Sequence, residues 1–199
     1  MGKSRQQSLA EKHHPGTIST SLYTISKGPR WCPLVPASAT ISSVGTVHIR
    51  RSTLASPDAA RLIAALDAEL TTTFPEPGAT HFSLSDAQVV AGDGAFLVAY
   101  LDDVAVGCGA IRRLDEATAE IKRMYVDPSV RGRGIGRALV EALEQEARLA
   151  GVTRIVLETG TRLAPAIKLY EAMGYAHIPL FGEYLSSPDT SLCFGKSLA

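Results

Sequence analysis

The chain has 199 residues, of which 45% are hydrophobic and 20% are charged, and its formal net charge is zero. This composition is typical of one globular domain with additional chain, and it excludes a wholly disordered or fibrous protein. No stretch approaches the length of a membrane span, and no apolar run follows a basic start as in a signal peptide. We therefore expect a cytoplasmic protein with no membrane partner.

The charge is unevenly distributed. Residues 1–51 are basic, with Glu11 as their single acid, whereas acidic residues outnumber basic ones over residues 52–199. Binding to nucleic acid requires a basic face that neutralises phosphates, so we expect no nucleic-acid partner for the folded part.

Residues 1–45 are rich in Ser, Thr, Pro and Gly and have no sustained periodicity. This pattern predicts a flexible N-terminal tail, or extra residues from a translation start site placed too far upstream. The segment is also basic and poor in acids, as organelle transit peptides are, although it lacks their Arg-rich amphipathic pattern.

From Val47 onward, regular elements are predicted in quick succession. Apolar residues recur at helical spacing after Pro57, which predicts a helix through Leu70. A second, short helix is weakly indicated over residues 85–91. Around these helices the sequence predicts strands over residues 47–51, 95–101, 104–114 and 119–126.

The second half alternates helices and strands. We expect helices over residues 134–150 and 162–173, a strand without alternation over 154–158, and a closing hairpin of 175–179 with 191–196. In the first of these helices Glu141, Glu144 and Arg148 are predicted to face outward. The order of elements predicts an α/β (α+β) fold over residues 46–199: a mixed, mostly antiparallel central sheet of about seven strands, flanked by helices.

Three widely spaced cysteines, Cys32, Cys108 and Cys193, form no metal-ligand pattern with each other or with the five His residues. Cys108 and Cys193 lie in apolar strand patterns, which favours buried free thiols. We expect no bound metal.

The glycine-rich run Arg131-Gly132-Arg133-Gly134-Ile135-Gly136-Arg137 lies directly between a strand and a helix. A helix start exposes unpaired N–H groups at the positive end of its dipole, glycines admit a phosphate close to the backbone, and guanidinium groups match phosphate oxygens. An anion site is therefore favoured over a solvated turn. The spacing differs from the Rossmann pattern G-x-G-x-x-G, and no Gly-Lys-Ser/Thr follows as in a P-loop.

Arg131, Gly134 and Gly136 match R/Q-x-x-G-x-G/A, the acetyl-CoA signature of the GNAT (N-acetyltransferase) superfamily, which this sequence resembles. Residues 166–175, AIKLYEAMGY, also resemble that family's A-I-x-L-Y-E-x-x-G-F/Y segment. The resemblance implies the GNAT fold, with a V-shaped opening between the strands 119–126 and 154–158 that holds acetyl-CoA. The expected cofactor-binding residues are Met124, Tyr125 and Val126 for the pantetheine arm, and Arg131, Gly132, Arg133, Gly134, Ile135, Gly136 and Arg137 for the diphosphate.

The resemblance also suggests catalytic residues. Tyr170 matches the tyrosine that faces the CoA sulfur in many GNAT enzymes, where it would donate a proton to the leaving thiolate, although a core tyrosine fits the apolar helix stripe equally well. For the base we prefer Glu158 narrowly over Glu120. Glu158 lies 12 residues before Tyr170, a spacing that resembles the family branch that acetylates ribosomal-protein N-termini, where a glutamate is the base. In the histone-acetylating branch the base would fall at Lys122, which is no carboxylate. An asparagine common in relatives is replaced here near Arg162.

The expected reaction is transfer of an acetyl group to a primary amine of a small molecule or amino acid. A protein N-terminus or lysine is the second acceptor class, and a non-catalytic acyl-CoA sensor is the alternative of another kind. In the family, the first helix region and the last hairpin set acceptor specificity, and these correspond here to His81-Phe82-Ser83 and Phe181-Gly182-Glu183-Tyr184. The aromatic rings beside Glu183 could hold a cationic amine, or they could merely cover the edge of the sheet. The sequence leaves the oligomeric state open, a homodimer included.

Overall fold

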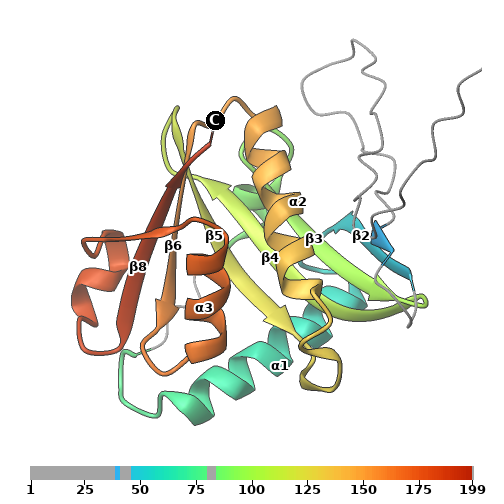
Figure 1. Ribbon diagram of the computed structural model, residues 1–199, viewed down its shortest axis with the longest axis horizontal. Helices are drawn as coiled ribbons and strands as arrows, with labels where there is room; N and C mark the ends of the chain where they lie inside the picture. Colours follow the sequence, from blue (N-terminus) through green and yellow to red (C-terminus); the bar gives the residue numbers. More distant parts are fainter. Residues whose placement is uncertain (1–38, 41–45, 80–83, 199) are drawn as a thin grey trace, which may run out of the picture.

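The computed structural model describes residues 39–40, 46–79 and 84–198 (Figure 1). The expected N-terminal tail therefore lies outside the described residues, as does Cys32, except that Ala39–Thr40 forms a two-residue edge strand, β1. No helix in the described ranges combines the length and apolar character that crossing a membrane requires.

One mixed sheet organises the molecule, with the strand order β1-β2-β3-β4-β5-β6-β8-β7. Neighbouring strands are antiparallel except for β5 and β6, which are parallel. The prediction of about seven strands in a mostly antiparallel sheet is confirmed, with β1 added at the edge. The remaining strands are β2 (Thr46–Ser52), β3 (Gly94–Leu101), β4 (Val104–Arg113), β5 (Thr118–Val126), β6 (Arg154–Gly160), β7 (Ala176–Ile178) and β8 (Ser191–Ser197).

Local sequence explains where these elements begin and end. The β3–β4 hairpin turns on Asp102 and Asp103, which both adopt positive φ, as the commonest two-residue hairpin turn requires. Helix α1 (Pro57–Thr73) begins at Ser56, whose hydroxyl accepts a 3.2 Å hydrogen bond from the amide of Ala59.

The other helices follow the predicted pattern with small shifts. Helix α2 spans Ile135–Leu149, and Gly151 adopts positive φ just beyond it. Helix α3 spans Ala164–Ala172 and is shorter than expected at its start, because the strand β6 and the turn after it extend to Leu163. The described residues also include three short 3-10 helices: η1 (Asp86–Val89), η2 (Pro128–Val130) and η3 (Gly182–Ser186).

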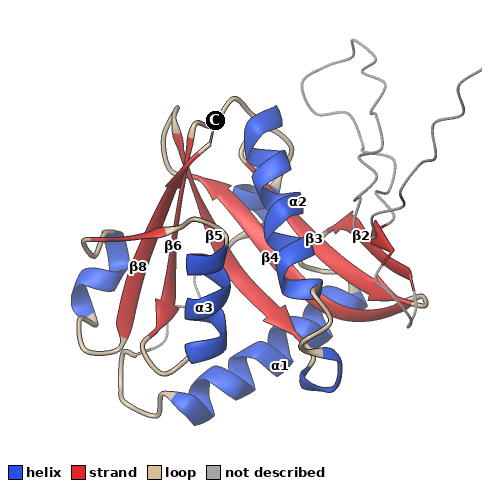
Figure 2. Ribbon diagram, in the orientation of Figure 1, coloured by secondary structure: helices blue, strands red, loops and turns tan. Residues whose placement is uncertain are grey.

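The helices cover the two faces of the sheet separately (Figure 2). Helices α2 and α3 pack on one face, in a core that includes Leu139, Leu143, Ile155 and Phe194. Helix α1 packs on the other face through Leu62 and Leu66, against residues of β3, β4 and β5. The sheet is thus covered on both faces at its centre, over β4 and β5.

The expectation that Glu144 faces outward was wrong. Its side chain is 5% exposed and accepts hydrogen bonds from Lys196 at 2.6 Å and from the Tyr175 hydroxyl at 3.2 Å, with Arg148 at 3.3 Å. Because β8 and the segment before β7 supply these donors, a carboxylate on a buried helix face is satisfied. Helical periodicity does not reveal such distant partners.

Candidate functional site

The two parallel strands separate at the middle of the sheet. Strands β5 and β6 are paired from Thr118 with Arg154 to Ile121 with Leu157, and β5 then continues to Val126 without a β6 partner. The edge of β5 that faces β6 is therefore without a strand over its last five residues. In Figure 1 the two strands diverge in a V from their paired ends, with α3 on the near side of the opening between them.

A β-bulge causes this divergence. In the β4–β5 ladder, Cys108 pairs with Tyr125 and Ala110 pairs with Lys122, so Arg123 and Met124 together oppose the single residue Gly109. Arg123 adopts φ +59°, a left-handed conformation. Such a bulge bends its strand and increases the local twist, which carries the end of β5 away from β6.

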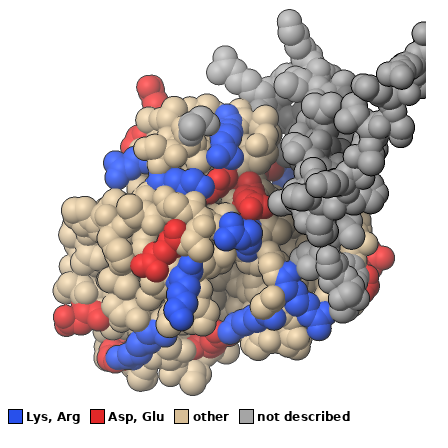
Figure 3. Space-filling view, in the orientation of Figure 1, with Lys and Arg blue, Asp and Glu red and all other residues tan. Residues whose placement is uncertain are grey.

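A cavity of about 640 Å³ occupies the opening. This volume is in the range typical of small-molecule sites. Basic side chains border the hollow on the face shown in Figure 3. Its lining combines α1, the end of β5, the glycine loop, the end of β6 and the start of α3: Leu66, Glu69, Leu70, Thr73, residues 121–126, Arg131, Gly132, residues 134–137, residues 158–160, Arg162, Leu163, Pro165, Ala166, Leu169, Tyr170 and Tyr184.

The glycine loop presents backbone amides to this cavity. Gly132 and Gly134 adopt φ of +79° and +80°, and Gly134 is the N-cap of α2. The first helical hydrogen bond runs from the amide of Ala138 to the carbonyl of Gly134, so the three preceding amides have no partner within the helix. At Gly136 a Cβ would lie 3.3 Å from Leu169. The loop therefore fits an anionic group such as a diphosphate.

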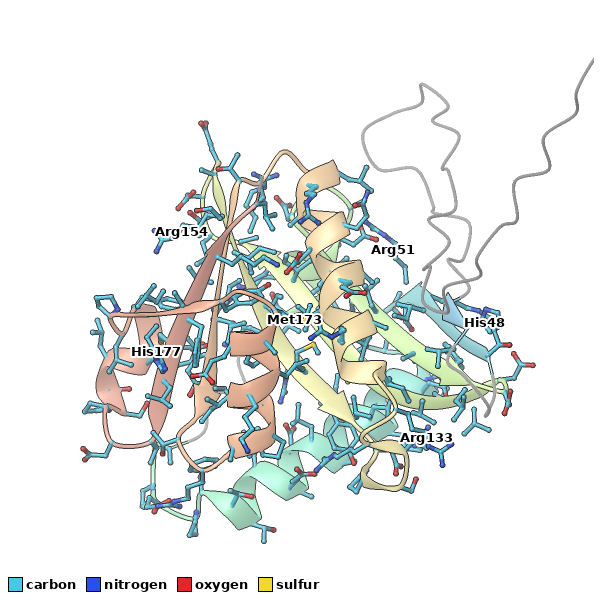
Figure 4. All side chains as sticks on the ribbon, in the orientation of Figure 1. His48, Arg51, Arg133, Arg154, Met173 and His177 are labelled. Carbon is cyan, nitrogen blue, oxygen red and sulfur yellow. The ribbon has the colours of Figure 1, made fainter. Side chains whose placement is uncertain are left out.

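The three arginines of the loop behave differently from one another. Arg131 donates to Glu69 of α1 at 2.6 Å and to the carbonyl of Val126 at 2.8 Å. Arg137 lines the cavity. Arg133 is not part of the lining and projects from the loop away from α3 (Figure 4).

Glu158 lies on β6 where that strand diverges from β5, and its carboxylate lines the cavity. Burial raises the pKa of Glu158 to about 7, and the neighbouring acids Glu120 and Glu183 raise it too, whereas a hydrogen bond with Ser191 and the charge of Lys122 lower it. At neutral pH this carboxyl group therefore exchanges protons readily.

Tyr170 lies on α3 with its side chain in the same cavity. Its ring is 4% exposed and packs edge-on against Tyr175 at a centroid distance of 5.9 Å. Burial and the negative charge of Glu158 raise the pKa of Tyr170, so its hydroxyl keeps its proton at neutral pH. The structure thus brings Tyr170 and Glu158 together at one cavity.

Glu120 occupies a different environment from Glu158. Its side chain is fully buried, does not line the cavity, and accepts a hydrogen bond from Arg112 at 2.7 Å and another from the Tyr184 hydroxyl at 2.5 Å. Glu120, the second candidate for the base, thus lies outside the cavity lining. The alternating pattern of β5 gave no sign that Arg112 and Tyr184 would enclose it.

Lys122 is a site residue whose position the sequence did not reveal. Its side chain is 4% exposed, and its ammonium group donates to the Tyr184 hydroxyl at 2.8 Å and forms an ion pair with Glu183. Tyr184 and Glu183, which the sequence suggested could hold a cationic amine, are therefore already occupied by the protein's own lysine. Tyr184, with 3% of its surface exposed, is a core residue and no mere cover of the sheet edge.

Other predicted features have simpler outcomes. Cys108 and Cys193 are buried free thiols, as expected, and burial raises the pKa of Cys108 to about 12. The described ranges contain no cluster of three or more His, Cys, Asp or Glu side chains that could hold a metal ion. The segment His81-Phe82-Ser83 lies outside the described residues.

Comparison with known proteins adds independent evidence. The family model described as "Acetyltransferase (GNAT) family" matches residues 61–175. An IAA acetyltransferase of Azospirillum brasilense is 43% identical over 130 residues, which are 64% of this chain and 83% of that protein. Two further curated relatives are matched over 64% and 53% of their length.

Solved structures share the fold. The putative acyl-CoA N-acyltransferase from Klebsiella pneumoniae has 33% sequence identity and a TM-score of 0.66, covering 77% of this chain and 98% of that one. A GNAT family acetyltransferase from Elizabethkingia anophelis, solved with acetyl-CoA bound, has 17% identity and a TM-score of 0.56 over 76% of this chain and 98% of its own. At that identity the second likeness shows the fold alone.

Proposed function

Because the chain belongs to the acetyltransferase (GNAT) family, we propose that it transfers the acetyl group of acetyl-CoA to a primary amine of a small molecule or amino acid. The observation that carries this proposal is the cavity between β5 and β6, which joins uncapped helix amides to a half-buried carboxyl group and a buried tyrosine. These are the groups that a thioester with a diphosphate tail and an amine acceptor would need.

Two features support the binding of acetyl-CoA. The edge of β5 from Lys122 to Val126 faces the opening without a partner strand, so the amide groups of a pantetheine arm can pair with it as an added strand does. The amides of Ile135, Gly136 and Arg137 then lie at the site of the diphosphate, where the helix dipole favours negative charge. Arg137 adds a positive side chain to this end of the cavity.

Glu158 acts as the general base in this proposal. An acceptor amine with a pKa of about 10.4 is mostly protonated at neutral pH and must lose a proton before it can attack. Glu158, with its pKa raised to about 7, accepts this proton directly or through one water molecule. The amine nitrogen then forms a bond to the acetyl carbonyl carbon as the carbon–sulfur bond breaks.

Tyr170 acts as the general acid. The departing thiolate, with a pKa of roughly 8.5, takes the hydroxyl proton of Tyr170, which is protonated at neutral pH because its pKa lies above the ordinary value. The products are an N-acetyl amide and the free thiol of CoA. The phenolate of Tyr170 and the protonated Glu158 return to their starting states by proton exchange with solvent, which balances the reaction.

The test measures CoA release with a thiol reagent across a panel of primary amines and amino acids, together with acetyl-CoA binding by calorimetry. We expect micromolar or tighter binding and acceptor-dependent CoA release. Binding without release for any acceptor in the panel would favour the non-catalytic sensor, and absence of binding would contradict the whole proposal. Acetylation of peptide N-termini or lysines in preference to small amines would shift the acceptor class.

A further inference from the structure

We infer that the acceptor carries a carboxylate close to its amine and that Lys122 binds this carboxylate. The inference rests on the proposed function and narrows its acceptor to amino acids and similar anionic amines. The juxtaposition behind it is that of Lys122 and Glu158, which lie on neighbouring strands and line the same cavity.

Of the charged residues clustered beside Glu158, Lys122 is the one that belongs to the cavity lining. Lys122 and Tyr184 belong to the cavity lining, whereas Arg112, Glu120 and Glu183 do not. The two acids that balance Lys122 are thus outside the lining: Glu120 is fully buried, and Glu183 is 31% exposed. An acceptor that enters beside Glu158 meets an ammonium group.

The geometry of Lys122 leaves one donor for a ligand. An ammonium group has three N–H donors, and here two of them serve Glu183 and the Tyr184 hydroxyl. Glu120 lies 3.9 Å away, beyond hydrogen-bond distance, and the described residues offer no other acceptor. The Tyr184 hydroxyl donates its own proton to Glu120. A carboxylate of the acceptor fits the third donor of this buried lysine.

The other charged residues of the cavity lining also favour an anionic acceptor over a polycationic one. Its basic residues are Lys122, Arg123, Arg131, Arg137 and Arg162, and its acids are Glu69 and Glu158. Glu69 is ion-paired with Arg131. Within the described part of the chain, a polyamine or a lysine in a basic peptide therefore finds no uncommitted carboxylate besides the base, and its second cation would be repelled by Lys122.

The experiment compares acceptors that differ only in the carboxylate, such as L-alanine with L-alaninamide and L-methionine with L-methioninamide. The amine of each amide is less basic than that of the amino acid, so a larger share of it is unprotonated and ready to attack. This difference favours the amides, so any observed preference for the amino acids underestimates the effect of the carboxylate. We expect kcat/KM to be at least about tenfold higher for the carboxylate member of each pair, as a charge-assisted hydrogen bond would give.

Two variants test the residue itself. In Lys122→Met the preference should disappear through a higher KM for the amino acid, with the KM for acetyl-CoA unchanged, whereas Lys122→Arg should retain it. Because Lys122→Met could fail to fold, Glu183→Gln serves as the complement: it removes the acid that competes for Lys122, so the amino acid should bind a few-fold more tightly. Equal or better turnover of the amides, or a preference that survives Lys122→Met, would overturn the inference.

Failure of the proposed function can be recognised separately. If no acceptor releases CoA, the transferase proposal fails, and calorimetry of each pair against the CoA-saturated protein decides the inference. Tighter binding of the carboxylate member that is lost in Lys122→Met would support it, and equal binding would overturn it.

Discussion

The hydroxyl of Tyr184 donates a 2.5 Å hydrogen bond to Glu120, a residue 64 positions away in the chain. This contact, together with Arg112, occupies the carboxylate of Glu120 inside the protein. Of the two carboxylates that line the cavity in the described residues, Glu69 is ion-paired with Arg131, whereas Glu158 has no ion pair. We therefore favour Glu158 as the base, and four predictions test the arrangement around it.

The first prediction concerns the general acid. Tyr170→Phe should lower kcat by about a hundredfold or more, because the leaving thiolate loses its proton donor, while calorimetric binding of acetyl-CoA stays unchanged. Tyr175→Phe is the matched control: its ring lies 5.9 Å from that of Tyr170, but its hydroxyl bonds to Glu144 outside the cavity. This control should lose some stability and keep its kcat. Full turnover in Tyr170→Phe would remove Tyr170 from the mechanism.

The second prediction concerns the pH dependence of turnover. With the pKa of Glu158 raised to about 7, kcat should rise with pH through about 7 as the carboxyl group ionises. Glu158→Gln should lose this rising limb of the pH profile, and its kcat should be lower by about a hundredfold at pH 8. Glu120→Gln should keep the limb and show its main effect as a lower melting temperature, because it weakens buried hydrogen bonds. A limb that persists in Glu158→Gln and vanishes in Glu120→Gln would exchange their roles.

The third prediction follows from the same carboxyl group and concerns stability. The folded protein holds the Glu158 proton up to about pH 7, whereas the unfolded chain releases it near the ordinary value of 4.5. Wild-type stability from this group is therefore full below pH 4.5 and is lost as pH rises through 7. Between pH 4 and pH 8, Glu158→Gln should gain about 3 kcal/mol in unfolding free energy relative to wild type, as urea titrations can measure. A constant difference would contradict burial of the charge.

The fourth prediction separates the loop's role in binding from backbone strain. Gly134 and Gly151 lie at opposite ends of α2 with φ of +80° and +75°. Alanine at either position should cost about 1 kcal/mol of stability, since a left-handed conformation is unfavourable with a Cβ. Only Gly134→Ala should weaken acetyl-CoA binding, by roughly tenfold, because Gly134 sets the amides at the cavity. Equal affinities in the two variants would argue against the diphosphate site.

Much of the fold could be predicted because local patterns encode it. The alternation of apolar residues, the glycine after α2 and the turn at Asp102-Asp103 each depend on neighbours within a few positions. Where the sequence prediction was wrong, at Glu144, a carboxylate on a helix face was buried because Lys196 and Tyr175 arrive from other elements. No local pattern contains that information.

By itself the sequence determined the order of the elements, the glycine loop before α2 and the family, because each depends on residue types at short, fixed spacing. The tertiary structure alone decided which charges meet. Lys122 joins Tyr184 from 62 positions away, and Arg131 joins Glu69 from another 62. The bulge at Arg123 sets how β5 leaves β6, and with it which carboxylate faces the cavity. Partners so distant in the chain are set by how helices and strands pack. The position of a charged residue within its own strand or helix indicates only which face of that element its side chain is on.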